Sequence, residues 1–393
     1  MKNVKRLAAI LICAVMAIGC FTGCHSKGEV VATASTADGS DTISITSGVY
    51  LTMLINADSQ TRSIVNEQLA DSASSTSDIN YAKQTVKDDD GTEYKFYDYV
   101  NKLAKEMCET YVATHYYFLK NGLELTDTEL STMSTYNNYQ WNYTGMAYLY
   151  EPNGVSYESF EQFMRVYSYE RSSLFDFYYG EGGEFAPAED EIKKGLEENF
   201  VVADVIEIAT TDDEGSALSD DDLTAIADKL QGYADRINAG EAFSAVNDEY
   251  KAETGNSDSS SDNSSSDSEE EKPLDELAQV YGTTNTSAAS DLTEEFLKLD
   301  IGTASVVKGT DGYYRMVLRK DVLEDPYYYN TYSNETTRLL YADEYEDYIS
   351  EQAKSIEITY NSYELNYLKP KKIDYTDYQN WYANAYGHGG SSY

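Results

Sequence analysis

The sequence reads Val201-Val202-Ala203-Asp204-Val205-Ile206-Glu207-Ile208 at the point where its apolar pattern changes period. Before this stretch, apolar residues recur at helical spacing. Within it they are nearly continuous and mostly β-branched, which predicts a strand. We therefore expect a domain boundary between residues 200 and 201, and a new domain that begins with this strand.

The domain expected over residues 201–322 mixes helices with strands. Residues 254–271 are mostly Ser, Asp and Glu, which cannot bury apolar surface, so this acidic insert is predicted to be disordered. The two last strands flank a Gly-Thr-Asp-Gly turn, as in a hairpin. The predicted elements after the first strand are a helix over 218–239, a short helix ending near Tyr250, a helix over 292–299, and strands over 304–308 and 312–319.

Residues 42–200 are expected to form an all-helical domain. Thr126 and Glu129 have the spacing of a capping box, which predicts that a helix begins there. Pro187 is followed by acidic residues, a pattern that suits the first turn of another helix. The longest predicted helix covers 96–120, and these residues share one face of it: Val100, Leu103, Met107, Tyr111 and Phe118.

Residues 323–372 are expected to hold one helix and one strand. The helix is predicted over 336–355, where Leu340, Tyr345 and Ile349 recur at helical spacing, and the strand over 356–360. The remaining residues, 373–393, are rich in Tyr, Asn and Gly and are expected to be loose.

Residues 1–23 have the features of a signal peptide. Basic residues precede an apolar run over 7–18 that is too short for a comfortable membrane span. Thr22-Gly23-Cys24 resembles the lipobox of bacterial lipoproteins, so we expect a lipid on Cys24, with Cys20 as the alternative and a plain secretory signal as a third possibility. Lipidation would hold the protein at the outer face of the cytoplasmic membrane, with residues 24–41 as a flexible tether.

The composition excludes several classes of function. The chain has 393 residues, and its 29 Lys and Arg against 69 Asp and Glu give a formal charge of −40, which is unsuited to binding nucleic acid. Its 3 histidines are His25 beside the lipid site, His115 within a predicted helix and His388 in the Gly-rich tail, which argues against a Ser/His/Asp hydrolase. The sequence has no Cys/His cluster, no calcium loop and no nucleotide-binding loop, so neither metal nor cofactor is expected. Cys108 is interpreted as a small core residue.

The order of short motifs resembles the SurA/PrsA-like group of extracytoplasmic chaperones and foldases. The matching motifs are Ile45-Thr46-Ser47-Gly48-Val49-Tyr50, Asn121-Gly122-Leu123-Glu124-Leu125-Thr126-Asp127-Thr128-Glu129-Leu130, Ala188-Glu189-Asp190-Glu191-Ile192-Lys193-Lys194, Ala239-Gly240-Glu241-Ala242-Phe243-Ser244-Ala245-Val246, Leu299-Asp300-Ile301-Gly302-Thr303-Ala304-Ser305 and Asp311-Gly312-Tyr313. The resemblance implies an α+β protein. Its helical domain would be completed by the C-terminal helix, and 201–322 would be a parvulin-like (PpiC-like) prolyl isomerase domain.

The chain departs from parvulins at the residues expected to form their catalytic pocket. Where the family has a pair of histidines, the sequence has Val205 (or Asp204) and Tyr314, and the acidic insert replaces a glycine-rich segment. Together with Leu292, these residues are interpreted as a degenerate pocket. Prolyl isomerisation needs a pocket that binds the twisted amide better than the planar one. We expect the domain to be catalytically inactive, with an active prolyl isomerase as the alternative.

One aromatic cluster is a candidate binding surface for unfolded polypeptides. Tyrosine offers apolar area with a polar tip, so an exposed group of tyrosines can bind many sequences. Core packing is the alternative interpretation. The sequence therefore predicts a membrane-anchored, ATP-independent chaperone for secreted polypeptides, and a surface substrate-binding or adhesion lipoprotein is a further alternative. The cluster is Tyr136, Tyr139, Trp141, Tyr143, Tyr148 and Tyr150.

Overall fold

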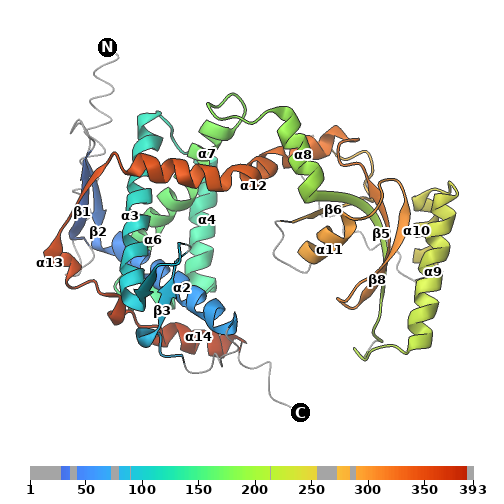
Figure 1. The fold of residues 1–393 in the computed structure, drawn as a ribbon, viewed down its shortest axis with the longest axis horizontal. Coiled ribbons are helices and arrows are strands. Elements are labelled where there is room, and N and C mark those ends of the chain that lie inside the picture. Colours follow the sequence, from blue (N-terminus) through green and yellow to red (C-terminus); the bar gives the residue numbers. More distant parts are fainter. Residues whose placement is uncertain are drawn as a thin grey trace. The chain divides into compact units, whose positions relative to one another are not determined.

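The computed structural model describes residues 28–35, 42–71, 79–88, 90–212, 214–254, 272–283 and 289–386. The chain divides into two compact units, which are described separately: Met1–Tyr178 with Glu344–Tyr393, here called the helical unit, and Tyr179–Asp343, here called the sheet unit. Helices and small antiparallel sheets occur together (Figure 1), so the expected α+β class is confirmed. The predicted signal peptide, Cys20, Cys24 and most of the acidic insert lie outside the described residues.

The helical unit is built from helices that the sequence largely predicts. Its longest predicted helix, 96–120, is confirmed as α3. The capping box is also confirmed, because the Glu129 backbone N–H donates to Thr126 Oγ1 at 3.2 Å while the Thr126 N–H donates to Glu129 Oε2 at 2.7 Å. The helices are α2 Ser47–Asp71, α3 Phe96–Lys120, α4 Asp127–Tyr143, α5 Met146–Tyr150, α6 Tyr157–Met164, the π-helix η2 Arg165–Glu170 and α7 Arg171–Tyr179.

The expectation of an all-helical first domain is wrong in one respect, because the helical unit contains small sheets. The main one has the order β2-β1-β9 and is antiparallel. Strand β1 lies in the predicted tether, where Val31, Ala32 and Ala34 are buried. Val30, Val31 and Thr33 favour a strand, but the run has only 6 residues, and it is held by its pairing with β2 and with the distant β9. The strands are β1 Val30–Ser35, β2 Thr42–Thr46 and β9 Glu357–Tyr360, with a separate hairpin of β3 Thr85–Lys87 and β4 Glu93–Lys95.

The end of the chain returns to the helical unit. The last part of α12 (Pro326–Ala353) packs there, with the Tyr345 ring 5.2 Å from Phe175 and the Tyr345 hydroxyl donating to the Arg171 carbonyl at 3.0 Å. The helix begins ten residues before the predicted start, since its Tyr- and Asn-rich first turns carry little helical signal. After β9 come α13 Ser362–Leu365, the short helix η3 Pro370–Lys372 and α14 Thr376–Tyr386. The tail was expected to be loose, but its described part, residues 373–386, is mostly helical.

The sheet unit has a four-stranded antiparallel sheet with the order β6-β5-β8-β7. The three predicted strands are confirmed, and β6 adds an edge strand that pairs with the start of β5. The predicted helices of this domain are also confirmed. The elements are α8 Glu189–Asn199, β5 Phe200–Ala209, α9 Asp220–Asn238, α10 Phe243–Thr254, β6 Gln279–Gly282, α11 Ala289–Phe296, β7 Ala304–Lys308 and β8 Tyr313–Lys320.

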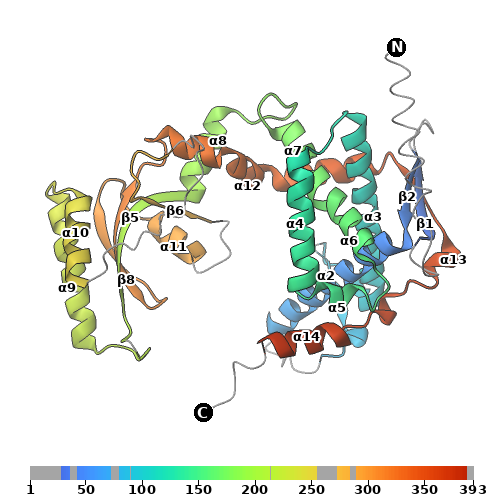
Figure 2. The same ribbon diagram turned by 180° about the vertical axis from the view of Figure 1, so that it is seen from behind.

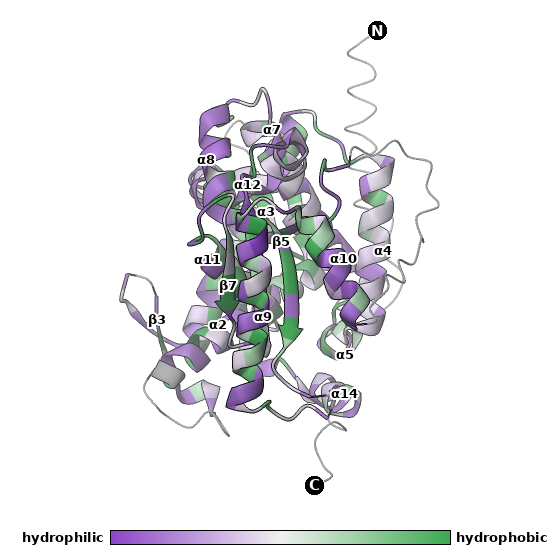
Figure 3. Ribbon diagram, turned by 90° about the vertical axis from the view of Figure 1, so that its right-hand side faces the viewer, coloured by the Kyte–Doolittle hydropathy of each residue, from purple (hydrophilic) through white to green (hydrophobic). Residues whose placement is uncertain are grey.

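Helices cover both faces of this sheet. On one face, Ile206 and Met316 pack with Leu230 of α9 and Val246 of α10. On the other, Val201, Ala203 and Val317 pack with Phe296 of α11. A strand buried on both faces reads as continuous apolar sequence, which is why β5 was recognisable and why it is hydrophobic along most of its length in Figure 3.

Helix α8 packs with the sheet although the sequence placed it with the helices before residue 201. Leu196 and Phe200 form one cluster with Val322 and Tyr328. Because Tyr328 is in the first turn of α12, the first part of α12 packs in the sheet unit. Gly195 lies so close to Leu340 that any side chain at position 195 would displace the Leu340 side chain. Within the residues that the structure describes, no helix is both long enough and apolar enough to span a membrane.

Candidate functional site

Helix α4 places three of the predicted tyrosines on the surface of the helical unit. Tyr136, Tyr139 and Tyr143 recur at intervals of three and four residues, which puts them on one side of the helix. Their exposed fractions are 48, 54 and 70%. The rings of Tyr139 and Tyr143 stack with centroids 5.6 Å apart. Tyr136 and Tyr139, together with Ser131, Thr132 and Thr135, line a shallow cavity of about 430 Å³.

Two other members of the predicted cluster are core residues. Trp141 and Tyr150 are 6 and 3% exposed, and their rings stack with centroids 6.1 Å apart. Burial raises the pKa of Tyr150 to about 12, and its hydroxyl accepts a hydrogen bond from Asn56 at 3.2 Å. The packing interpretation therefore applies to these two residues.

Tyr148 on α5 extends the exposed tyrosines beyond α4. It is 49% exposed and follows a turn at Gly145, whose φ of +82° suits glycine. The Tyr148 ring stacks with Trp381 of α14, with centroids 6.2 Å apart. Trp381 in turn stacks with Tyr378 at 5.7 Å. The C-terminal helix thus joins this surface, and Figure 2 shows α14 beside α5 below α4.

Helix α14 contributes aromatic residues that the sequence did not assign to the site. Tyr382 and Tyr386 are 54 and 63% exposed, and Trp381 is half-buried. The helical spacing of Tyr378, Trp381 and Tyr382 was the available signal. We call the whole set the tyrosine surface: Tyr136, Tyr139, Tyr143, Tyr148, Trp381, Tyr382 and Tyr386.

The sequence around the tyrosine surface is acidic. No Lys or Arg occurs in residues 121–164, which contain α4 and α5, and none occurs in residues 373–386, which contain α14. Aromatic faces attract cations as well as apolar groups. The arrangement can therefore bind apolar and aromatic side chains, and it favours segments with positive charge. The acidic residues of these two segments are Glu124, Asp127, Glu129, Glu151, Glu158, Glu161, Asp374 and Asp377.

The residues proposed as a degenerate parvulin pocket do not all meet. Val205 and Leu292 pack in the cluster beside α11. Tyr314 packs beside α9 on the opposite face, because alternate residues of β8 point to opposite faces. The other residue considered, Asp204, is 1% exposed and forms an ion pair with Lys320 at 2.9 Å. Burial raises the pKa of Asp204. One pocket made of Val205, Leu292 and Tyr314 is therefore wrong.

An ion-paired arginine occupies the face of the sheet that Val205 shares. Arg315 is 4% exposed and lies opposite Glu207 in the register of β5 and β8. Its Nε donates to Glu207 Oε2 at 3.2 Å, and its two terminal nitrogens donate to Asp311 at 3.0 and 2.7 Å. The Arg315 guanidinium lowers the pKa of Asp311. This part of the sheet is thus charged and internally paired.

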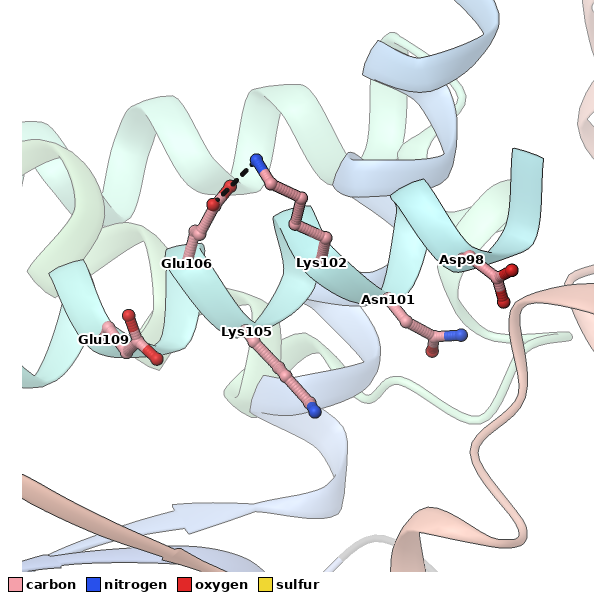
Figure 4. A pocket seen from close by; sticks show the side chains of 6 residues that line it. All are labelled: Asp98, Asn101, Lys102, Lys105, Glu106 and Glu109. Carbon is pink, nitrogen blue, oxygen red and sulfur yellow. Dashed lines mark ion pairs between the residues drawn. The ribbon is translucent and has the colours of Figure 1, made fainter. Parts of the chain in front are cut away.

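Other clusters of polar residues lack the features of a site. On α3, Lys102 and Glu106 form an exposed ion pair at 2.9 Å, and the side chains lining the hollow beside them point outward along the helix without converging (Figure 4). Cys108 is fully buried, and burial raises its pKa to about 12, as expected for a core thiol. Among the described residues, no group of His, Cys, Asp or Glu could hold a metal ion.

His115 is a partly exposed residue of α3 that takes part in a polar cluster around the buried carboxylate of Glu170. Its Nδ1 lies 2.7 Å from Glu170 Oε2, and Arg165 Nε donates to Glu170 Oε1 at 3.1 Å. Glu170 is fully buried at the end of the π-helix η2. Both of its oxygens are therefore satisfied, and the cluster joins α3 to η2.

No protein-family model matches the chain, and no curated protein does. Among solved structures, the foldase protein PrsA of Lactococcus lactis is 15% identical, with a TM-score of 0.34 over 68% of this chain and 87% of that one. PrsA of Streptococcus pneumoniae is 14% identical, with a TM-score of 0.37 over 73% of this chain and 99% of that one. PrsA of Bacillus subtilis is 13% identical, with a TM-score of 0.27 over 70% of this chain and 91% of that one.

Proposed function

We propose that this protein is an ATP-independent, extracytoplasmic chaperone that binds unfolded secreted polypeptides on its tyrosine surface. A lipid on Cys24, or on Cys20, would hold it at the outer face of the cytoplasmic membrane. The observation that carries the proposal is the exposure of Tyr136, Tyr139, Tyr143 and Tyr148 on two adjoining helices.

The chemistry of tyrosine suits reversible binding of varied sequences. Its ring buries a large apolar area against a partner, while the hydroxyl keeps the free surface wettable. Its side chain has two rotatable bonds, so little conformational entropy is lost on contact. A surface that binds through such contacts needs no nucleotide to drive it. The excess of acidic residues would also keep the protein soluble beside aggregating clients.

The sheet unit would support binding without catalysing prolyl isomerisation. The charged residues Arg315, Glu207 and Asp311 occupy the face beside Val205, and Tyr314 lies on the other face. Stabilising a twisted prolyl amide requires a pocket complementary to it. A buried guanidinium with its hydrogen bonds satisfied by two carboxylates is a stable structural element and a poor lining for such a pocket.

The proposal is tested by suppression of aggregation without ATP. The full chain is mixed with an unfolded secreted protein, such as reduced α-lactalbumin, and light scattering is followed. The variant with Tyr136, Tyr139, Tyr143 and Tyr148 all changed to Ser should bind at least about tenfold more weakly, since central aromatic contacts each contribute more than about 1 kcal/mol.

A matched control changes two exposed tyrosines elsewhere on the helical unit. Tyr363 and Tyr367 are 65 and 54% exposed. Their replacement by Ser should leave suppression unchanged. Equal suppression by the four-serine variant and the wild type would overturn the proposal.

A further inference from the structure

Gly145 forms a notch that an aromatic ring of the chain itself fills. The six-membered ring of Trp381 lies where a Cβ at position 145 would be. Any residue other than glycine at this position would therefore clash with the ring. The same indole stacks with Tyr148 at an interplanar angle of 22°. The notch and the neighbouring ring therefore form a seat for one flat aromatic side chain.

The helix that carries Trp381 is weakly held. None of the residues of α14 is fully buried, and the helix has 11 residues, fewer than an isolated helix needs to be stable in water. Its contacts with the rest of the helical unit are made by Tyr378, which packs at the edge of the cluster containing Leu149, and by Trp381, which stacks on Tyr148. One aromatic pair contributes about 0.5–1.5 kcal/mol. Without a fully buried side chain, α14 is held less firmly than the core helices.

The segment just before α14 is firmly fixed. Asn153 donates to the Asp374 carbonyl at 2.8 Å and accepts from the Asp374 N–H at 2.8 Å. The Tyr375 hydroxyl donates to the buried Asp58 at 2.8 Å, and the Arg62 guanidinium lies 4.5 Å from the centre of the Tyr375 ring. The Thr376 N–H also donates to Asp374 Oδ1 at 2.9 Å, so residues 374–376 form a fixed point from which the rest of α14 can move.

We infer that α14 covers Tyr148 and the notch at Gly145, and that a client displaces α14 by placing an aromatic side chain in the seat of Trp381. The tyrosines of α4 and α5 are then the part of the tyrosine surface that binds the client. The inference rests on the proposed function and names its preferred substrate: a segment with an aromatic residue flanked by Lys or Arg. The aromatic residue fits because the seat already holds one. The basic flanks fit because the surrounding segments, 121–164 and 373–386, contain acidic residues and no basic ones.

The protein has 2 tryptophans, so displacement can be observed directly. In a Trp141→Phe variant of the full chain, Trp381 is the only tryptophan. The probe is a short synthetic peptide with one Phe between lysines and without Tyr or Trp. Binding should shift Trp381 emission to longer wavelength and increase its quenching by iodide. If Trp141→Phe fails to fold, the difference between the wild-type and Trp381→Phe spectra gives the same signal.

Two matched peptides test the substrate chemistry. Replacing Phe by Ala, or both lysines by Glu, should weaken binding at least about tenfold. Binding of the Phe peptide without any change in Trp381 emission would overturn the inference, as would equal binding of the Ala peptide.

A Trp381→Ala variant tests competition between α14 and the client. Removing the internal occupant should tighten peptide binding roughly three- to tenfold, which corresponds to the loss of one or two aromatic pairs. Equal or weaker binding would contradict the inference.

The proposed function and the displacement of α14 can fail separately. If unfolded clients bind while Trp381 is unaffected, the inference alone is wrong, whereas if no client binds, the proposed function is wrong.

Discussion

Arg315 and Glu207 lie directly opposite each other on the two central strands of the sheet unit, with Arg315 Nε 3.2 Å from Glu207 Oε2. Asp311 holds the other end of the same guanidinium through two hydrogen bonds. A charged pair at facing positions of central strands determines what this face can do. It fixes the end of the hairpin between β7 and β8 and places charge on the face of the sheet that Val205 shares.

We expect no prolyl isomerase activity. Proline-limited refolding of an unfolded substrate should proceed at the same rate with and without the protein, because the charged face does not complement a twisted amide. A known prolyl isomerase serves as the positive control in the same assay. Acceleration that disappears in a Leu292→Ala variant would show instead that the surface beside α11 is catalytic.

The buried Asp204 predicts a distinctive pH dependence of stability. Burial raises its folded pKa above the ordinary value of 3.8, so the folded state binds the proton more tightly than the unfolded state. Its contribution is favourable at low pH and is lost as the pH rises above about 4. An Asp204→Asn variant should therefore gain stability relative to the wild type over that range, measured as the free energy of unfolding in urea.

Asp311 supplies the control with the opposite sign. Its hydrogen bonds to Arg315 lower its folded pKa below 3.8, so its favourable contribution is present above that pH and is lost as the pH falls. The Asp311→Asn variant should differ most from the wild type at neutral pH and least in acid. If the free energy of unfolding of the two variants changed with pH in the same direction relative to the wild type, the opposite pKa shifts assigned to Asp204 and Asp311 would be wrong.

Gly145 should be more sensitive to substitution than other glycines with positive φ. A Gly145→Ala change forces alanine into the left-handed region, which costs roughly 1–2 kcal/mol, and it also displaces Trp381. Gly122→Ala is the matched control, because Gly122 has a φ of +71° and no other atom within 4 Å of the added Cβ. Chemical denaturation should show a larger loss for Gly145→Ala. Equal losses would mean that Trp381 does not pack on Gly145.

Cys108 should be inert in the folded protein. It is fully buried with its pKa raised to about 12, and the thiolate is the reactive form. Treatment with iodoacetamide near pH 8, followed by mass spectrometry of the peptide containing Cys108, should show modification only after denaturation. The other cysteines fall in different peptides and do not interfere. Rapid labelling under native conditions would show that this part of the helical unit opens.

Local patterns were enough to predict the elements with strong periodicity. Helix α3 was predicted residue for residue, and the capping box at Thr126 and strand β5 followed from side-chain types alone. Strand β1 and helix α14 were missed for a common reason. Both elements are short, with 6 and 11 residues, and contacts with distant segments order them, as in the pairing of Ala34 with Ile358.

The site was predicted in part. Four of the six aromatic residues are exposed as expected, whereas Trp141 and Tyr150 are core residues, because burial depends on packing between helices that the sequence does not reveal. Tyr314 was placed beside Val205 by alignment alone. A shift of one residue in a strand moves a side chain to the other face, so the pocket could not be assigned without the register.

The most direct test of client binding is site-specific photo-crosslinking. A benzophenone amino acid is placed at Tyr139 on the tyrosine surface or, as the control, at Tyr363 on α13, which are 54 and 65% exposed. Each full-length variant is irradiated with an unfolded secreted client in the absence of ATP. We expect strong crosslinking from position 139 and little from position 363. Equal crosslinking from both positions, or none from position 139, would contradict the assignment of the tyrosine surface as the client-binding site.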